Sequence, residues 1–388
     1  MKIAIIGTRG IPARYGGFET LADKLSSRLA DRGHEVTVYC RRLFVRPEDS
    51  FDRRIRRVVL PSISTKYLDT FSHTLLSVLH VLFTDVEVVL LCNVANSPFA
   101  WIPRLFGKPV ILNVDGLDRK RRKWNWWGRL YLLACELIAL FTPTILVTDA
   151  QTIKSYFWKR YRKRSEMIAY GAEVPPGVAG LDGFPLLPRR FLLYVSRLEP
   201  ENNPEVVIRA FGKVATDWPL VIVGGNPYNE HYVRHLKSIA DPRVVFTGPV
   251  YGDRYWQLQI NAGLYVCASE IGGTHPGLIE AMVAQNAVLY CNTPENREVV
   301  GDCGIPFQLR IEELTTRMRG ALQNPYLRAQ LGVRSRKRAE TIYGWERIAA
   351  QYEALIYRTH GYTLPDRHST PAPELPSWSG EGPNREVT

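Results

Sequence analysis

The chain has 388 residues, of which 45% are apolar, and its formal net charge is +12. This length and apolar content exclude a chain too small or too polar to bury a sizeable core, and they indicate two domains. The apolar run after Lys2 is too short for a secretory signal peptide, so we expect a cytoplasmic protein. The six cysteines form no C-x-x-C pair, which predicts reduced, buried thiols.

The first predicted elements are a short strand at 3–6, a loop with four glycines and a helix that begins near Phe18. Glycines let the backbone approach a ligand closely, and the N–H groups at a helix start attract anions. We therefore predict a phosphate-binding loop at Gly16 and Gly17. The spacing is not G-x-G-x-x-G directly after the strand, which argues against NAD.

The rest of the first domain alternates helix and strand, which predicts a doubly wound parallel sheet. Two apolar stretches, 74–91 and 130–147, approach membrane-spanning length, but acidic residues and a proline interrupt them. We expect each to be a buried helix followed by a strand. The predicted elements are a helix at 20–29 and strands at 35–40, 88–92, 109–114 and 144–147.

Prolines and glycines crowd residues 175–190, where we place a linker between domains 1–174 and 191–342. A second strand and helix alternation follows, and 343–358 is predicted to be an amphipathic helix. The final residues, 360–388, have the composition of a disordered tail. The predicted strands are 191–196, 220–223, 244–247, 264–268 and 287–291, with helices at 204–214 and 277–284.

The excess positive charge lies entirely in the first domain: residues 1–170 carry +13 and the remainder carries −1. Basic residues interleaved with indoles suit an anionic membrane surface. The alternatives are a solvated basic face with aromatics packed below it, and nucleic acid binding, for which no recognised module is present. The candidate membrane or acceptor residues are Arg119, Lys120, Arg121, Arg122, Lys123, Trp124, Trp126 and Trp127, with a second basic run at 159–164 beside Trp158.

The second domain holds the more specific pattern. Arg197 follows a strand, where the mouth of a parallel sheet receives its ligand, and its guanidinium could clamp a diphosphate. The alternative is a surface salt bridge with Glu199 or Glu201. Further on, a glycine loop with Gly273 and Thr274 precedes a helix that carries Glu280. The loop could bind phosphate and Glu280 could accept from sugar hydroxyls, although a solvent-facing glutamate is also possible.

Four segments carry a resemblance: IGTRGIPARYGGFET at 6–20, NVDGLDRKRRKW at 113–124, SRLEPENN at 196–203 and GGTHPGLIEAM at 272–282. The chain resembles the family 4 glycosyltransferases of the GT-B architecture, and within them the rhamnosyltransferase-like group of bacterial polysaccharide enzymes. The resemblance implies two Rossmann-like domains that face each other across a cleft. It also implies retaining transfer of a sugar from a nucleotide diphosphate donor to a lipid-linked acceptor, without metal or other cofactor, and no D-x-D motif is present.

Carried over to this sequence, the resemblance places Gly16 and Gly17 at the donor's phosphates and sugar, and Arg197 at the diphosphate. Gly273 and Thr274 would supply loop amides, and Glu280 would bind the ribose or deoxyribose. The chain departs from the family pattern at Asn202, where a lysine is common, and at Gly272, where a glutamate is common. We include Asn202 among the donor-binding candidates.

Catalysis needs a group near the acceptor hydroxyl, and Asp115 is our candidate because it closes a predicted strand and precedes a glycine. It would act as a base or orient the acceptor, unless it caps the next helix. His73 is a second candidate. Arg197 would stabilise the leaving diphosphate.

The resemblance favours dTDP-rhamnose as donor, with UDP- and GDP-sugars as alternatives, and an undecaprenyl-diphosphate-linked saccharide as acceptor at the inner face of the cell membrane. Two other functions are considered: a nucleotide-sugar epimerase of the same two-domain shape, and a catalytically inert membrane-associated scaffold. Donor binding separates both enzymes from the scaffold, and dependence on an acceptor separates the transferase from the epimerase.

Overall fold

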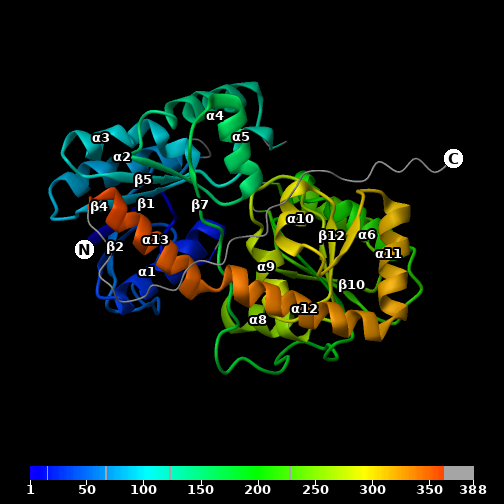
Figure 1. The fold of residues 1–388 in the computed structure, drawn as a ribbon. Coiled ribbons are helices and arrows are strands. Elements are labelled where there is room, and N and C mark those ends of the chain that lie inside the picture. The colour runs from blue at the N-terminus through cyan, green and yellow to red at the C-terminus, as the bar shows by residue number, and fades with distance from the viewer. Residues whose placement is uncertain (15, 66–67, 122–123, 227–228, 362–388) are drawn as a thin grey trace.

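The structure is a computed structural model that describes residues 1–14, 16–65, 68–121, 124–226 and 229–361. The chain folds into two α/β domains that lie side by side, each built on a parallel sheet (Figure 1). The predicted fold class of two doubly wound parallel-sheet domains is confirmed. Residues 175–190 between the sheets contain no helix or strand, and most of the predicted tail lies outside the described residues.

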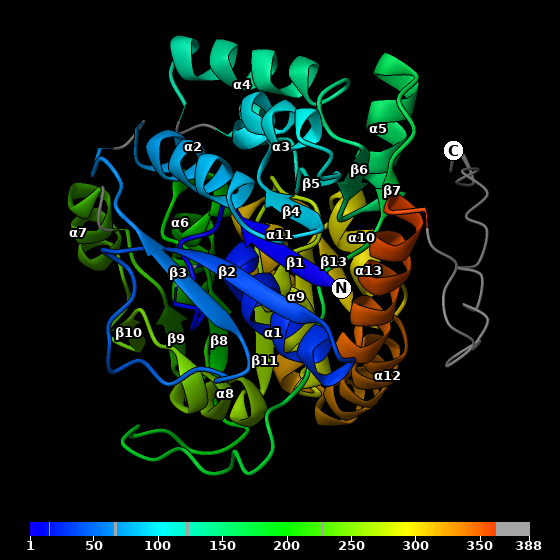
Figure 2. The same cartoon turned by 90° about the vertical axis from the view of Figure 1, so that its left-hand side faces the viewer.

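The N-terminal domain has a seven-stranded sheet in the order β3-β2-β1-β4-β5-β6-β7. Alternate residues of β1 face opposite sides of the sheet: Ile3 and Ile5 pack in the core with α1 and α13, whereas Ala4 and Ile6 pack with α2, α4 and α5. The two helical layers are separated by the sheet in Figure 2. The strands are β1 (Lys2–Ile6), β2 (Glu35–Arg41), β3 (Arg56–Leu60), β4 (Val88–Cys92), β5 (Val110–Asn113), β6 (Ile145–Thr148) and β7 (Glu166–Met167), and the helices are α1 (Gly17–Asp31), α2 (Leu68–Leu82), α3 (Trp101–Leu105), α4 (Trp126–Ile138) and α5 (Gln151–Tyr161), with short 3-10 turns η1 (Val94–Phe99) and η2 (Asp118–Lys120).

The C-terminal domain has a six-stranded sheet in the order β10-β9-β8-β11-β12-β13, again with parallel neighbours. Its strands are β8 (Leu192–Val195), β9 (Leu220–Val223), β10 (Val244–Gly248), β11 (Leu264–Cys267), β12 (Val288–Cys291) and β13 (Ile305–Phe307), and its helices are α6 (Pro204–Gly212), α7 (Glu230–Ser238), α8 (Gly252–Asn261), α9 (Pro276–Val283), α10 (Pro294–Val300), α11 (Ile311–Gln323) and α12 (Pro325–Tyr343), with the 3-10 turn η3 (Pro200–Asn202). In both sheets the strand order reverses beside the first strand of the domain, and ligands of such sheets bind beyond the carboxyl ends of the strands at that point.

The sequence reasoning missed three strands, and all three lie at a sheet edge. β3 carries two arginines, β7 has only two residues and β13 contains Pro306. Edge strands are short, charged or interrupted by proline because one side of each has no partner strand. The expectation of buried helices was also wrong for α2 and α4, because each exposes several large apolar side chains.

The last described helix, α13 (Trp345–Thr359), follows the second domain in sequence but packs on α1 of the first (Figure 1). Glu353 accepts hydrogen bonds from Arg32, at 2.8 Å, and from His34, at 2.9 Å. Deeper in the contact, the amide of Asn113 donates to the hydroxyl of Tyr352 at 2.7 Å. The helix therefore ties the end of the chain to the first sheet.

Replacing Glu353 with alanine is expected to lower the free energy of unfolding by about 1–3 kcal/mol, because it leaves two partly buried donors without their acceptor. Thermal unfolding followed by circular dichroism measures this change. The control is Glu340→Ala, which breaks an exposed pair with Arg336 along α12 and is expected to cost at most about 0.5 kcal/mol. Equal losses in the two variants would contradict a structural role for the α1–α13 contact.

Candidate active site

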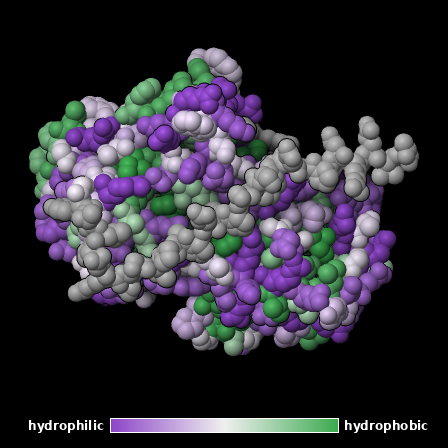
Figure 3. Space-filling view, in the orientation of Figure 1, coloured by the Kyte–Doolittle hydropathy of each residue, from purple (hydrophilic) through white to green (hydrophobic). Residues whose placement is uncertain are grey.

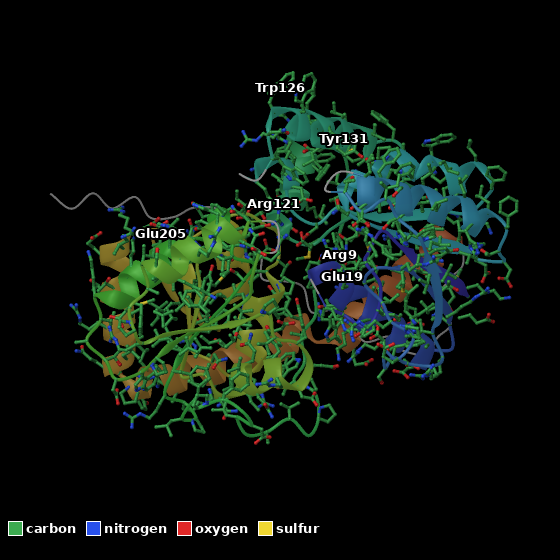
Figure 4. The ribbon with its side chains drawn as sticks, turned by 180° about the vertical axis from the view of Figure 1, so that it is seen from behind. Arg9, Glu19, Arg121, Trp126, Tyr131 and Glu205 are labelled. Atoms are coloured by element: carbon green, nitrogen blue, oxygen red, sulfur yellow. The ribbon has the colours of Figure 1, made fainter. Side chains whose placement is uncertain are left out.

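The glycine loop after β1 lies against the C-terminal domain. The carboxylate of Glu19, in the first turn of α1, accepts the backbone N–H of Arg9 at 2.9 Å and holds the loop closed (Figure 4). A Cβ on Gly17 would lie 3.1 Å from Pro276 at the start of α9. The structure thus brings the predicted phosphate loop to the helix that follows the second predicted loop.

Asp115 lies just beyond β5, at the boundary between the domains. Its φ is +53°, and its N–H donates to the side chain of Asn113 at 3.0 Å, which stabilises the left-handed turn. The next helical turn, η2, begins at Asp118 and is not capped by Asp115. Burial raises the pKa of the Asp115 carboxyl, and the nearby Asp118 raises it further. The capping alternative is therefore wrong, and the carboxyl remains a candidate for chemistry between the domains.

Asp149, just beyond β6, is a site residue that the sequence reasoning missed. Its carboxylate accepts the N–H of Thr274 at 2.7 Å, and its backbone carbonyl accepts the hydroxyl of the same threonine. A Cβ on Gly116 would lie 2.6 Å from the carbonyl carbon of Gly272, so the backbones of the two domains touch. The signal was an acidic residue after a strand, the same signal that identified Asp115 on the neighbouring strand.

Arg197 follows β8, and its guanidinium lies 3.6 Å from the carboxylate of Glu199 while a third of its side chain stays exposed. The pair leaves guanidinium N–H groups for a ligand. Asn202, in contrast, is buried and already engaged: its amide donates to the carbonyl of Arg197 at 2.7 Å and its oxygen accepts from Ser269. Its position corrects the expectation of a donor contact, because the side chain holds the Arg197 loop instead.

Glu280 points from α9 toward a neighbouring helix. The hydroxyl of Tyr255, on α8, donates to its carboxylate, and Gln259 donates to that hydroxyl at 2.7 Å. Burial raises the pKa of Glu280. The alternative of a solvent-facing glutamate is therefore wrong. The hydrogen bond from Tyr255 holds the carboxylate in one orientation, on the helix that follows the 272–274 loop.

The structure divides the basic segment 119–127 into an interior part and an exposed part. Arg119 pairs with Glu136 at 2.8 Å and donates to Tyr156, while Arg121 pairs with Asp118 at 2.7 Å. Figure 4 places Arg121 between the domains, and its positive charge interacts electrostatically with both Asp115 and Glu199. These two arginines are therefore not free surface cations, contrary to their grouping with the membrane residues.

The remaining members of that group are distributed as follows. Trp124 packs at the start of α4 against the core of the first domain, which corrects its assignment to an exposed surface. Trp126 and Trp127 are 65% and 70% exposed. Lys120 lies in η2, and Arg122 and Lys123 lie outside the described residues. A cavity of 390 Å³ beside α4 is lined by Arg119, Trp126, Arg129, Leu130 and Leu133.

His73 lies in α2, fully buried in the N-terminal domain. Burial lowers its pKa to about 4, and the charged groups near it are Arg41 and Asp69. A fully buried, neutral imidazole is a weaker candidate for the reacting centre than Asp115, which lies at the boundary between the domains. The six cysteines are all free and buried, as expected.

Among the residues that the structure describes, no group of three or more His, Cys, Asp or Glu side chains could hold a metal ion. None of the helices there is both long and apolar enough to cross a membrane.

Two doubly wound domains that meet at the carboxyl ends of their strands form the GT-B architecture. The family model described as "Glycosyltransferase Family 4" matches residues 15–171, and the model described as "Glycosyl transferases group 1" matches residues 186–338. Together the two models span most of the chain, one on each domain. The chain is therefore a glycosyltransferase of the GT-B type, with the family 4 and group 1 sequence patterns.

Individual relatives are distant in sequence. Spore coat protein SA of Bacillus subtilis is 24% identical, with 90% of this chain and 97% of that protein covered. The sucrose-phosphate synthase of Thermosynechococcus elongatus has a TM-score of 0.77 at 18% identity, with 93% of this chain and 99% of that one covered. HepE of Anabaena, solved in complex with UDP-glucose, has a TM-score of 0.71 at 14% identity, with 92% and 100% covered.

Proposed function

We propose that this glycosyltransferase moves a sugar from a nucleotide diphosphate donor to a lipid-linked saccharide, with retention of configuration, in the synthesis of a cell-surface polysaccharide. The observation that carries the proposal is the meeting of the two strand-end loops, where Thr274 contacts Asp149 beside Asp115. Each domain contributes one side of this contact. A donor held by the second domain would therefore present its reacting sugar to the carboxyl groups of the first.

Arg197 and the backbone N–H groups of Gly272 and Gly273 would stabilise the negative charge that grows on the leaving diphosphate. The N–H of Thr274 was also expected to bind the donor, but it already donates to Asp149. In retaining transfer the acceptor attacks on the face from which the diphosphate departs, so the leaving phosphate takes the acceptor's proton. Asp115 would then orient the acceptor hydroxyl. Glu280, fixed by Tyr255, would accept from the ribose or deoxyribose.

HepE, of similar fold, has been solved with UDP and with UDP-glucose, which supports a nucleotide diphosphate sugar for this chain as well. The resemblance of the sequence to rhamnosyltransferases favours dTDP-rhamnose.

Isothermal titration of the full chain with dTDP-, UDP- and GDP-sugars tests the donor, and transfer of labelled sugar to an undecaprenyl-diphosphate-linked saccharide tests the acceptor. We expect one nucleotide class to bind and label to appear on the lipid only when the acceptor is present. Conversion of the donor sugar without acceptor would instead indicate an epimerase. No binding to any member of the panel would contradict the proposal and favour the scaffold.

The exposed apolar side chains of the N-terminal domain support an acceptor embedded in a membrane. Most of them come from α2, α3, α4 and the turns that follow them, and hydrophobic residues gather over α2 and α3 in Figure 3. Monomeric proteins rarely expose large contiguous apolar areas, and this domain is also the basic one. The most exposed members are Phe83, Leu105, Phe106, Trp126, Trp127 and Phe141. We propose that this face rests on the inner surface of the cell membrane, where indoles prefer the interface.

Replacing Trp126 and Trp127 together with serine is expected to weaken binding to vesicles of anionic lipid by about tenfold or more, since two exposed indoles would no longer enter the interface. Co-sedimentation with vesicles of phosphatidylglycerol and phosphatidylethanolamine measures the partition. The matched control is Tyr326→Ser, a comparably exposed aromatic residue on α12 of the second domain, which is expected to leave the partition unchanged. A partition unaffected by the double substitution would place the membrane contact elsewhere.

A further inference from the structure

Asp149 is a carboxyl group with no exposed surface, although it lies where two domains meet. One carboxyl oxygen, Oδ2, accepts the N–H of Thr274 at 2.7 Å. Among the described residues, no N–H or O–H group with a fixed hydrogen reaches the other oxygen, Oδ1. The carboxyl groups of Asp149 and Asp115 lie within hydrogen-bonding reach of each other, and Oδ1 is the oxygen that Thr274 leaves unoccupied.

A hydrogen bond between two carboxyl groups needs a proton, because two ionised carboxylates offer only acceptors. A buried pair of this kind holds one proton between its members, since two negative charges in contact in a low-dielectric interior repel strongly. The geometry also favours one assignment of the two Asp149 oxygens. Oδ2 accepts an N–H, as a carbonyl oxygen does, and Oδ1 is the oxygen available to carry the hydrogen.

We propose that Asp149 is held as a neutral carboxylic acid whose Oδ1–H donates to the ionised carboxylate of Asp115, while its Oδ2 accepts the Thr274 amide. Asp149 is then a positioning residue. It fixes the orientation of Asp115 through one oxygen and the 272–274 loop of the other domain through the second. The inference rests on the proposed function only where it concerns activity, because the protonation of Asp149 can be measured without a substrate.

The surrounding charges favour a proton on Asp149 and a negative charge on Asp115. Arg121 lowers the pKa of Asp115, whereas burial and the charge of Asp115 raise the pKa of Asp149 well above its ordinary value. The guanidinium of Arg121 therefore acts on the Asp115 side of the pair. The groups that interact electrostatically with the pair are Asp118 and Arg121 after β5, Cys92 on β4, Tyr170 after β7, Tyr352 on α13 and His275 before α9. Two further acidic groups lie one step away: Glu199 interacts with Arg121, and Glu298 on α10 accepts the N–H of Gln151.

The direction of the pH dependence follows from the raised pKa. The native state holds the proton more tightly than the unfolded chain, so the contribution of this contact is complete below the ordinary pKa of an aspartate and is lost as pH rises through the raised pKa. Deprotonation puts a second negative charge beside Asp115 and against the loop. Transfer should therefore decline on the alkaline side as the contact between the domains opens.

The spectroscopic test uses the full chain labelled with aspartate carrying ¹³C in the side-chain carboxyl. At neutral pH we expect a carbonyl stretching band of a protonated aspartic acid in the infrared spectrum, shifted by the label and absent from Asp149→Asn. The label excludes the buried Glu280 as its source. Absence of the band from the unsubstituted protein, or its persistence in Asp149→Asn, would overturn the proposal whether or not the chain transfers a sugar.

The kinetic test compares two substitutions across pH. Asparagine can donate to Asp115 and accept from Thr274 without a titrating proton, whereas alanine can do neither. We expect Asp149→Asn to be at least about tenfold more active than Asp149→Ala and to lack the alkaline decline. Equal loss in both variants, or an alkaline decline that survives in Asp149→Asn, would contradict the role given to Asp149. If no transfer occurs in any variant while the infrared band is present, the proposed function fails and the protonation stands.

Discussion

Replacing Gly273 with alanine is expected to reduce sugar transfer by about 100-fold or more. A Cβ at this position would lie 2.0 Å from Oδ1 of Asp149 and 2.2 Å from Oδ2, and that carboxyl cannot retreat because it is buried and bonded to Thr274. The loop must therefore move away from the first domain. A displacement of about 1 Å between reacting groups is enough to cost a factor of about 100.

The collision lies between the domains, so each domain is expected to keep its own core and the melting temperature to change little. Initial rates at saturating donor and acceptor measure the effect. Gly320→Ala is the matched control: this glycine lies within α11, and no atom approaches its Cβ position within 4 Å. Alanine there should leave transfer unchanged and stabilise the helix by about 0.5–1 kcal/mol. Nearly full activity of Gly273→Ala would mean that the loop does not occupy this position during the reaction.

The sequence predicts the interior of this fold well, because its central strands are uninterrupted apolar runs. β4 and β9 begin and end at the predicted residues, as expected for parallel strands buried on both faces. The edge strands escaped prediction because they lack that signature. β3, for example, begins with two arginines, so its sequence resembles a polar segment. Only its pairing with β2 in the folded chain shows that it is a strand.

The sequence predicts the site residues of each domain separately. This explains why one residue was missed and another was assigned a wrong role. Asp115 and the 272–274 loop were each identified from local patterns, but only the folded chain shows that Asp149 joins them. A residue that acts across a domain boundary has no local signature, because its partner lies 125 positions away in the sequence. The same limit applies to Asn202, whose side chain is consumed by the loop of Arg197.

The composition predicts that the first domain carries an excess of positive charge, but it does not show which of the basic side chains face solvent. Arg119 and Arg121 belong to one basic run with the exposed indoles, yet the fold turns both guanidinium groups toward acidic partners, Glu136 and Asp118. What reaches the surface is the pair Trp126 and Trp127, together with apolar side chains of α2 and of the later part of α4, both of which had been expected to be buried helices. The membrane hypothesis therefore keeps Trp126 and Trp127 from the group that suggested it, but it replaces the arginines of that group with exposed apolar side chains.

Replacing Arg197 with alanine is expected to weaken binding of the nucleotide diphosphate sugar by about 100-fold. Two charge-assisted hydrogen bonds to the diphosphate would be lost, which corresponds to about 3 kcal/mol. The carboxylate of Glu199, 3.6 Å from the guanidinium, would in addition face the incoming phosphates without its cation. Isothermal titration with the nucleotide sugar that the unsubstituted protein binds measures the change in Kd.

Two further variants separate the guanidinium's geometry from its charge and from general effects. Arg197→Lys keeps the charge but loses the paired donors, so we expect an intermediate Kd. Arg190→Ala removes an exposed arginine that pairs with Asp217 on the same domain, and it should bind the donor as the unsubstituted protein does. If Arg197→Ala binds within about threefold of the unsubstituted protein while Arg190→Ala is equally unaffected, the diphosphate does not lie at the end of β8. The donor would then have to be held by other groups of the second domain, of which the 272–274 loop and Glu280 are the remaining candidates.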